Sequence, residues 1–138
     1  MSTYVGDRIP PPLRFDLGKP AAPGETAQGV LLATVDEDGS PRVAVLAGSE
    51  VRVAGDRNFR IVIRSAHATC ANLLSRPHAS LWCVLDGAAY TIHASSAADG
   101  EVENDLQTVD FTVNGVWCDF RPEAPLIAGP TYRIPAVD

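Results

Sequence analysis

Lysine is almost absent from this chain: its 138 residues include eleven basic side chains, and only one of them, Lys19, is a lysine. The seventeen acidic side chains outnumber the basic ones, which gives a formal net charge of −6 at pH 7. Binding to a phosphate backbone requires clustered cations, so this balance argues against nucleic acid as the main partner. The basic residues that are present are arginines, whose planar fork grips a phosphate or a carboxylate.

Cysteine is also scarce, and the sequence has no CxxC pair. The three cysteines are Cys70, Cys83 and Cys118, and each lies within an apolar stretch. The missing pair excludes the common zinc and redox motifs. We therefore expect three reduced, buried thiols, as in a cytosolic protein.

Long apolar runs are missing as well. No run approaches the roughly 20 residues that a membrane-spanning helix requires, and residues 1–16 lack the apolar core of a signal peptide. We expect no membrane association and a cytoplasmic location. A length of 138 residues with 46% hydrophobic side chains suits a single domain with a core of its own.

Regular structure is not expected in residues 1–27, which we interpret as a proline-rich N-terminal arm preceding a single domain at residues 28–138. Prolines remove backbone donors and fix φ, so the arm is predicted to be loose or laid along a surface. A short helical turn at residues 25–28 is the one regular element that the sequence allows there. The prolines of the arm are Pro10, Pro11, Pro12, Pro20 and Pro23.

The rest of the chain reads as short strands joined by tight turns. Alternating or continuous apolar patterns predict strands at residues 30–35, 42–46, 50–53, 59–64, 79–85 and 89–95. Residues 106–120 form either a hairpin about Asn114-Gly115 or a single strand with a bulge. Turns are expected at Asp38-Gly39 and Asp86-Gly87, and residues 132–134 close the tail. Six or seven antiparallel strands with one or two short helices predict a mainly β, closed or nearly closed barrel.

One clear helix is predicted, over residues 66–75. Ala66, Cys70, Leu73 and Leu74 form its apolar stripe, Ser65 is the expected N-cap, and Pro77 ends it. A neighbouring stripe of this helix is polar and carries Thr69, Asn72 and Arg76.

Polar groups converge where the strand ending at Arg64 meets this helix. A helix start offers free backbone amides that favour an anion. Ser65 adds a hydroxyl there, Arg64 a fixed positive charge, and His67 lies in the first turn. These groups could cradle a phosphate. The structural alternative is that Ser65 is only a cap, Asn72 bonds a nearby loop, and Arg64 is solvated.

Two stretches carry a resemblance to a known family. The first is Gly29-Val-Leu-Leu-Ala-Thr-Val-Asp-Glu-Asp-Gly-Ser-Pro-Arg-Val43. The second is Ile61-Val-Ile-Arg-Ser-Ala-His-Ala-Thr-Cys-Ala-Asn-Leu-Leu-Ser-Arg-Pro77, which contains a T-x-x-N-L-x-x-x-P pattern. In order and spacing they resemble the flavin-binding split barrels related to pyridoxamine 5'-phosphate oxidase. The resemblance covers about residues 29–95.

The resemblance implies a split β-barrel that forms a homodimer, with cofactor sites at the interface. The usual ligand is FMN; some members use a deazaflavin, and a few bind haem or nothing. Carried onto this sequence, it implies phosphate contacts from Arg64, Ser65, Thr69 and Asn72, with His67 assisting. The flavin ring is then expected along the strand backbone at residues 62–63, that is, at Val62 and Ile63.

The sequence departs from that family in two places. Thr69 stands where many FMN binders place a lysine or an arginine, and His67 or Arg76 are the candidates to replace that charge. The chain is also short after Ser95. Three interpretations stay open: an FMN-dependent oxidoreductase acting on a small molecule, a non-catalytic split-barrel dimer that has lost its flavin, and a deazaflavin-dependent reductase. No residue stands out as a catalytic acid or base.

The remaining aromatic and titratable side chains are expected to have no direct role in ligand binding or catalysis. Trp82 and Trp117 are expected to pack in the core or a dimer interface rather than stack on a flavin. His93 is expected off the core face, as a bystander rather than a proton donor.

No metal site is predicted. The three histidines, His67, His78 and His93, lack the spacing of a metal site. Glu101, Glu103 and Asp105 lack the ligand spacing and glycine of an EF-hand, so a solvated loop is expected there.

Overall fold

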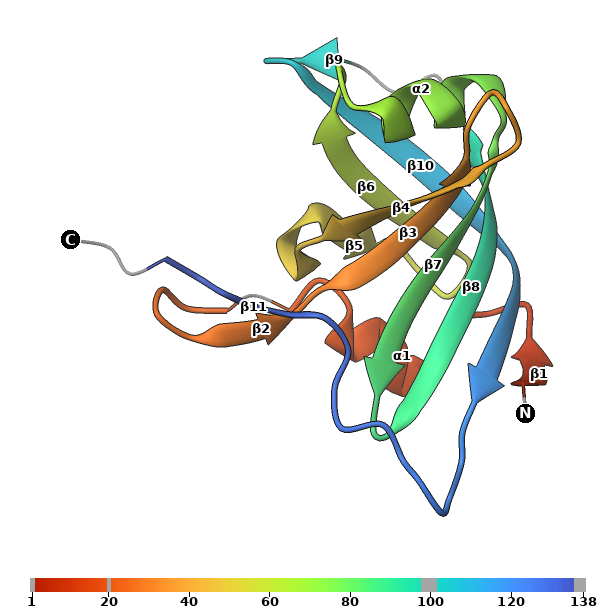
Figure 1. Cartoon of the computed structure of the whole chain (residues 1–138), viewed down its shortest axis with the longest axis vertical. Coiled ribbons are helices and arrows are strands. Elements are labelled where there is room, and N and C mark those ends of the chain that lie inside the picture. Colours follow the sequence, from red (N-terminus) through yellow and green to blue (C-terminus); the bar gives the residue numbers. More distant parts are fainter. Residues whose placement is uncertain (1, 20, 98–101, 136–138) are drawn as a thin grey trace.

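The computed structural model describes residues 2–19, 21–97 and 102–135, and antiparallel strands dominate it (Figure 1). The strands are β1 (Ser2–Gly6), β2 (Thr26–Gln28), β3 (Val30–Val35), β4 (Pro41–Leu46), β5 (Val51–Val53), β6 (Asn58–Arg64), β7 (His78–Leu85), β8 (Ala88–Ala97), β9 (Val102–Glu103), β10 (Leu106–Asp119) and β11 (Thr131–Arg133). The helices are α1 (Pro11–Asp16) and α2 (Ala68–Ser75), with a 3₁₀ turn η1 (Gly48–Glu50). The prediction of a mainly β fold is confirmed.

One curled sheet makes up the body of the molecule. Its strand order is β4-β3-β7-β8-β10-β6-β5, while β1 and β9 pair with β10 outside this path. A separate ribbon is formed by β2 and β11, which projects from the barrel in Figure 1. Because β4 and β5 lie at opposite ends of the path, they are not paired with each other, and the barrel is left open between its two ends.

The core fills the inside of this curl. Successive strands send alternate side chains inward, as their period of two requires. Phe59 of β6 and Phe111 of β10 are directly paired, and their rings stack with centroids 4.8 Å apart. Leu32, Leu81 and Ile92 are fully buried on β3, β7 and β8.

The predicted turns and the long last strand are confirmed in detail. Asp86 and Gly87 both have positive φ, as a two-residue hairpin turn requires. Residues 106–119 form a single strand with an irregularity between Val113 and Gly115, so the bulged strand is the correct alternative. Gly115 has no room for a side chain, since a Cβ there would lie 2.8 Å from a ring carbon of Trp117.

The prediction for the N-terminal arm is wrong. Residues 2–6 form β1 along β10, residues 11–16 form α1, and residues 26–28 form a strand rather than a helical turn. Pro11 and Pro12 occupy the first positions of α1, where the missing N–H has no intrahelical partner in any case. Ile9, Leu13 and Leu17, spaced four residues apart, are buried in the barrel core.

Smaller corrections concern the helix, the last loop and one thiol. The helix begins at Ala68 rather than at residue 66, and Leu74, expected in the apolar stripe, is 55% exposed. Of the predicted acidic loop, Glu101 lies outside the described residues, and Glu103 lies in the short strand β9. Cys70 and Cys83 are buried free thiols, but Cys118 is half-buried.

Packing of α1 against the core predicts a large effect of shortening Leu13. We expect Leu13→Ala to lower the free energy of unfolding by about 2–5 kcal/mol, the usual range for a buried leucine. Urea denaturation measures this. Phe15→Ala, on the same helix at a side chain that is 83% exposed, is the matched control and should change stability by less than about 0.5 kcal/mol. Equal effects of the two variants would mean that α1 does not form part of the core.

Candidate functional site

A cleft of about 420 Å³ lies where the two ends of the curled sheet approach each other. That volume is within the range of about 300–1,000 Å³ typical of small-molecule sites. One wall is β4 and the other is the end of β6 with the start of α2 (Figure 1). The lining residues are Arg42, Val43, Ala44, Val45, Leu46, Glu50, Ile63, Arg64, His67 and Thr69.

The structure brings four of the seven predicted site residues to this cleft. Ile63, Arg64, His67 and Thr69 line it. The other three, Val62, Ser65 and Asn72, are not among its lining residues. Val62 is half-buried and, by the alternation along β6, lies on the opposite face from Ile63.

The helix cap differs from the prediction. His67, not Ser65, is the N-cap of α2: its Nδ1 accepts the backbone N–H of Thr69 at 3.1 Å. The predicted cap was wrong because the chain stays irregular through residue 67, and the backbone N–H of Ser65 donates to the carbonyl of Asp105 instead. With Nδ1 accepting, neutral His67 carries its proton on Nε2, so this ring nitrogen is a donor.

Asn72 does not line the cleft, and its side chain is engaged by protein groups instead. Its amide nitrogen donates to Thr34 Oγ1 at 3.1 Å and to Asp36 Oδ1 at 2.7 Å. Its Oδ1 accepts from Arg76 Nη2 at 3.0 Å. Both donors and the acceptor of the amide are thus engaged by neighbouring protein groups, which is the structural alternative stated above. The interaction fastens α2 to the end of β3 and to the turn that follows it.

The most informative feature of the site is the hydroxyl group of Thr69, which has no hydrogen-bond partner among the described residues. The residue is 1% exposed, lines the cleft, and its Oγ1 has no hydrogen-bond partner among the described residues. A buried polar atom left unpaired costs about 1–3 kcal/mol, so such atoms are rare and call for an explanation. The hydroxyl oxygen lies within the wall of the cleft rather than exposed on it, and the described residues leave its hydrogen bonding open.

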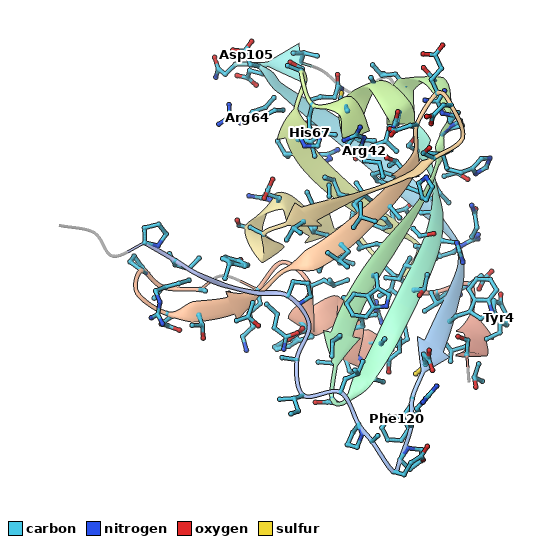
Figure 2. The ribbon with its side chains drawn as sticks, in the orientation of Figure 1. Tyr4, Arg42, Arg64, His67, Asp105 and Phe120 are labelled. Carbon is cyan, nitrogen blue, oxygen red and sulfur yellow. The ribbon has the colours of Figure 1, made fainter. Side chains whose placement is uncertain are left out.

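Arg64 differs from the other arginine on the same strand face. Arg60 donates from Nε to Asp110 Oδ1 at 2.7 Å across the β6–β10 pair. The side chain of Arg64 makes no hydrogen bond or ion pair within residues 2–19, 21–97 and 102–135, so its charge stands unpaired at the cleft. Figure 2 shows Arg64 on the same side of the molecule as His67 and Arg42.

Arg42 is a cleft residue that the sequence analysis missed. It lies opposite Thr34 in the β3–β4 pair, and its Nε donates to Asp36 Oδ1 at 2.8 Å. This bond raises the pKa of Arg42, so the guanidinium is charged. The position of Arg42 in the second strand of the hairpin could have indicated its place. It is paired there with Thr34, whose side chain contacts Asn72 of α2.

The same hydrogen bonds act on Asp36. Those donated by Arg42 and Asn72 hold the pKa of Asp36 below its ordinary value. The carboxylate is therefore charged at neutral pH and anchors both donors.

Comparisons with known proteins identify the architecture. No family model matches the sequence, and no curated protein matches it. Among solved structures, a predicted pyridoxamine 5'-phosphate oxidase from Lactobacillus delbrueckii superposes with a TM-score of 0.64 at 14% identity, covering 80% of this chain and 93% of that one. A variant of HupZ from Group A Streptococcus gives 0.61 at 14% identity over 80% and 98%. An FMN-binding protein from Syntrophomonas wolfei gives 0.54 at 17% identity over 64% and 75%.

This chain folds as a split barrel. The fold implied by the resemblance in residues 29–95 is therefore confirmed, and the cleft occupies the split between β4 and β6. At these identities the comparison establishes the fold alone.

The tryptophans of the split barrel lie away from the cleft. Trp117 is half-buried on β10, with its ring 4.8 Å from that of His93 and 5.0 Å from that of Tyr4. His93 is exposed and contacts Ser80 Oγ through Nδ1 at 2.8 Å. Trp82 does not line the cleft either, so neither tryptophan is placed to stack on a ligand there.

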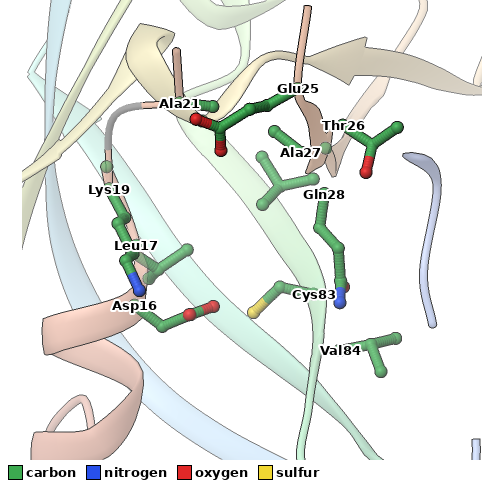
Figure 3. Close-up of a pocket in the computed structure, with 14 residues that line it drawn as sticks. Asp16, Leu17, Lys19, Ala21, Glu25, Thr26, Ala27, Gln28, Cys83 and Val84 are labelled. Atoms are coloured by element: carbon green, nitrogen blue, oxygen red, sulfur yellow. The ribbon is translucent and has the colours of Figure 1, made fainter. Parts of the chain in front are cut away.

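A second cavity, of about 260 Å³, lies among α1, β2 and β7 (Figure 3). Its lining contains none of the predicted site residues. Cys83 forms part of its floor, and burial raises the pKa of this thiol to about 12. The thiol is therefore protonated at neutral pH and is no nucleophile.

Two features are absent from the described residues: a membrane-spanning helix and a cluster of metal-ligating side chains. No helix in the described part of the chain is long and apolar enough to cross a membrane. No three metal-ligating side chains gather within residues 2–19, 21–97 and 102–135.

Asp36 predicts an acid-dependent loss of stability. Its folded pKa is lowered, so its contribution is full above the unfolded pKa of about 3.9 and is lost as the pH falls through the folded pKa. We expect the urea midpoints of the wild type and Asp36→Asn to differ at pH 6, and the difference to shrink as the pH falls below the unfolded pKa of about 3.9. Glu37→Gln, in the same turn, is the control and should stay parallel to the wild type. A constant gap between wild type and Asp36→Asn would contradict the assignment.

Proposed function

We propose that this protein is a cytoplasmic flavin-dependent oxidoreductase that holds FMN in the cleft of the split barrel and acts on a small molecule. The observation that carries the proposal is a pair of cleft residues: Thr69, whose buried hydroxyl has no partner among the described residues, and Arg64, whose charge is unpaired there. The split-barrel fold and the similarity to an FMN-binding protein support it.

The residues present fit an FMN phosphate at the α2 end of the cleft. A phosphate carries roughly two negative charges and three acceptor oxygens. Arg64 offers charged donors, Thr69 a hydroxyl, and His67 its Nε2–H. Ser65, half-buried next to Arg64 in the chain, makes no side-chain hydrogen bond within the described residues, but it does not line the cleft.

The β4 end of the cleft fits a flat, largely apolar ring. Ala44, Leu46 and Ile63 line it, and the last two are buried. β4 is also an edge strand, so one row of its backbone N–H and C=O groups is not used by the sheet. These groups would orient the polar edge of a ring laid along the strand.

Bound FMN would supply the hydride or electron chemistry, as cofactors do in this class of enzyme. The chain's own residues would bind the phosphate, orient the ring and keep water from one of its faces. None is required as a catalytic acid or base, in agreement with the lack of a candidate in the sequence.

We also propose that the protein is a homodimer, with the cleft at the interface. Val43 and Val45 of β4 are 59% and 65% exposed, and they border the cleft. β-branched apolar side chains exposed together on an edge strand favour cover by another surface. A second copy placed there would both bury these valines and close the open side of the cleft.

A non-catalytic split barrel is the second candidate. Thr69 supplies no charge where many FMN binders carry a basic residue, and a barrel that had lost its flavin would keep the fold. Such a protein would be colourless when purified and would stay so with added FMN. A deazaflavin is a third ligand, but its acidic tail requires more positive charge than one unpaired arginine beside α2 provides.

The decisive measurement is flavin fluorescence during titration with FMN. We expect saturable quenching at one FMN per chain. Arg64→Ala should weaken binding about 10- to 100-fold, as for the loss of a hydrogen bond to a charged group. Arg60→Ala, on the same face of β6 but paired with Asp110, is the matched control and should bind like the wild type. No binding by the wild type would leave the non-catalytic candidate.

The dimer predicts a mutation-sensitive molar mass. Light scattering after size exclusion should give twice the chain mass for the wild type. Val43→Glu should give the chain mass, because it places a charge in the proposed interface. Phe15→Glu introduces the same charge at an exposed apolar residue of α1 and should leave the dimer intact. A wild type with the mass of one chain would contradict the proposal.

A further inference from the structure

The proposed phosphate site is short of positive charge. At the start of α2 only Arg64 brings an unpaired cation to the cleft, because position 69 is a threonine. A phosphate with roughly two negative charges would be poorly balanced by a single arginine. The sequence offered two replacements, His67 and Arg76, and the geometry decides between them and a third residue.

Arg76 is committed elsewhere. Its Nε donates to the carbonyl of Val35 at 2.8 Å, and its Nη2 donates to Asn72 Oδ1 at 3.0 Å. It does not line the cleft. Arg76 therefore belongs to the fastening of α2 to the sheet and is not available to a ligand.

His67 supplies a hydrogen bond but no charge in its capping role. Its Nδ1 must be unprotonated to accept the N–H of Thr69 at 3.1 Å. Protonation of that nitrogen would replace this bond by a contact between two donors. The capping bond occupies Nδ1, so only Nε2 of His67 is left to a ligand.

Arg42 both carries a positive charge and has donors available to a ligand in the cleft. It lines the same cleft from the opposite wall, on β4, and its charge is fixed by the hydrogen bond of Nε to Asp36 at 2.8 Å. The two η nitrogens make no hydrogen bond with the described residues, so one edge of the planar fork is held and the other is free. Figure 2 shows Arg42 beside His67, between β4 and α2.

The orientation of Arg42 is itself controlled. Asp36 Oδ1 accepts from Arg42 and also from Asn72, whose amide is buried beneath α2. The carboxylate therefore cannot follow Arg42 out into solvent without giving up the Asn72 bond. Asp36 acts as a positioning residue that aims the free edge of the guanidinium along the cleft.

We infer that Arg42 supplies the second positive charge of the phosphate site and replaces, from β4, the basic residue missing at position 69 of α2. This inference rests on the proposed binding of FMN and extends it to a residue outside the strand-to-helix junction. A phosphate held by Arg42 and Arg64 together would be bound by both ends of the open sheet. Phosphate binding would then also fasten the split of the barrel.

The test compares two flavins that differ by the phosphate. Dissociation constants for FMN and for riboflavin are measured by fluorescence for the wild type, Arg42→Gln and Arg60→Gln. We expect Arg42→Gln to weaken FMN about 10- to 100-fold, as for a lost charged hydrogen bond, and riboflavin less than about twofold. Arg60→Gln is the control: it removes an arginine that is also paired with an aspartate but does not line the cleft, and it should leave the FMN-to-riboflavin ratio unchanged. Arg42→Lys, which keeps the charge without the fork, should lie between the wild type and Arg42→Gln.

The outcomes separate this inference from the function on which it rests. Wild-type binding of FMN with an unchanged ratio in Arg42→Gln would overturn the role of Arg42 and leave the flavin site standing. An equal loss of FMN and riboflavin in Arg42→Gln would also overturn it, since Arg42 would then shape the cleft rather than bind phosphate. No binding of either flavin by the wild type would remove the proposed function itself. Circular dichroism of each variant shows that it is folded.

Discussion

The side-chain amide of Asn72 is the interaction on which the geometry of the cleft depends. It is 5% exposed, and it joins three segments that are far apart in sequence: Thr34 at the end of β3, Asp36 in the following turn, and Arg76 after α2. Because α2 is only eight residues long and buries four of them against the barrel, apolar contact alone would leave it free to slide. A fully satisfied buried amide admits one register.

That register determines what the cleft can recognise. Fixing α2 places Thr69 in one wall of the cleft, and the same network holds Asp36 where it binds Arg42 in the other wall. The two walls are thus tied together behind the cleft by protein hydrogen bonds. The side chains in front of it, Arg64 and the free edge of Arg42, are left without partners in the described structure. Such a division between a satisfied support and an unsatisfied face is what a preorganised anion site requires.

The sequence predicted the barrel well and the site only in part, for identifiable reasons. In strands such as residues 59–64, the apolar side chains of the core face alternate strictly with those of the other face. The Asp86-Gly87 turn likewise has a clear local signal, so local pattern and tertiary structure agree at these places. The N-terminal segment was missed because its prolines outweighed the four-residue spacing of Ile9, Leu13 and Leu17, which is informative only once a helix is assumed. Capping by His67 was missed because histidine is a rare cap and Ser65 a common one. The sequence predicted the polar stripe of α2 correctly. Its burial could not be predicted, because it depends on contacts with Thr34 and Asp36, which belong to another strand and its turn.

Arg42 illustrates a limit of reasoning from motifs. A motif at the strand-to-helix junction draws attention to residues adjacent in sequence, whereas a cleft in an open barrel has two walls contributed by its two ends. The residue that balances a charge lost at position 69 need only lie across the gap, and β4 lies there because the sheet curls, not because the sequence is near. Holding Arg42 at its Nε on Asp36 is opposed by the rotamer entropy of a long side chain. This guanidinium, held on one edge and free on the other, together with the unpaired hydroxyl of Thr69, is the physical basis of the proposal that the cleft binds an anion.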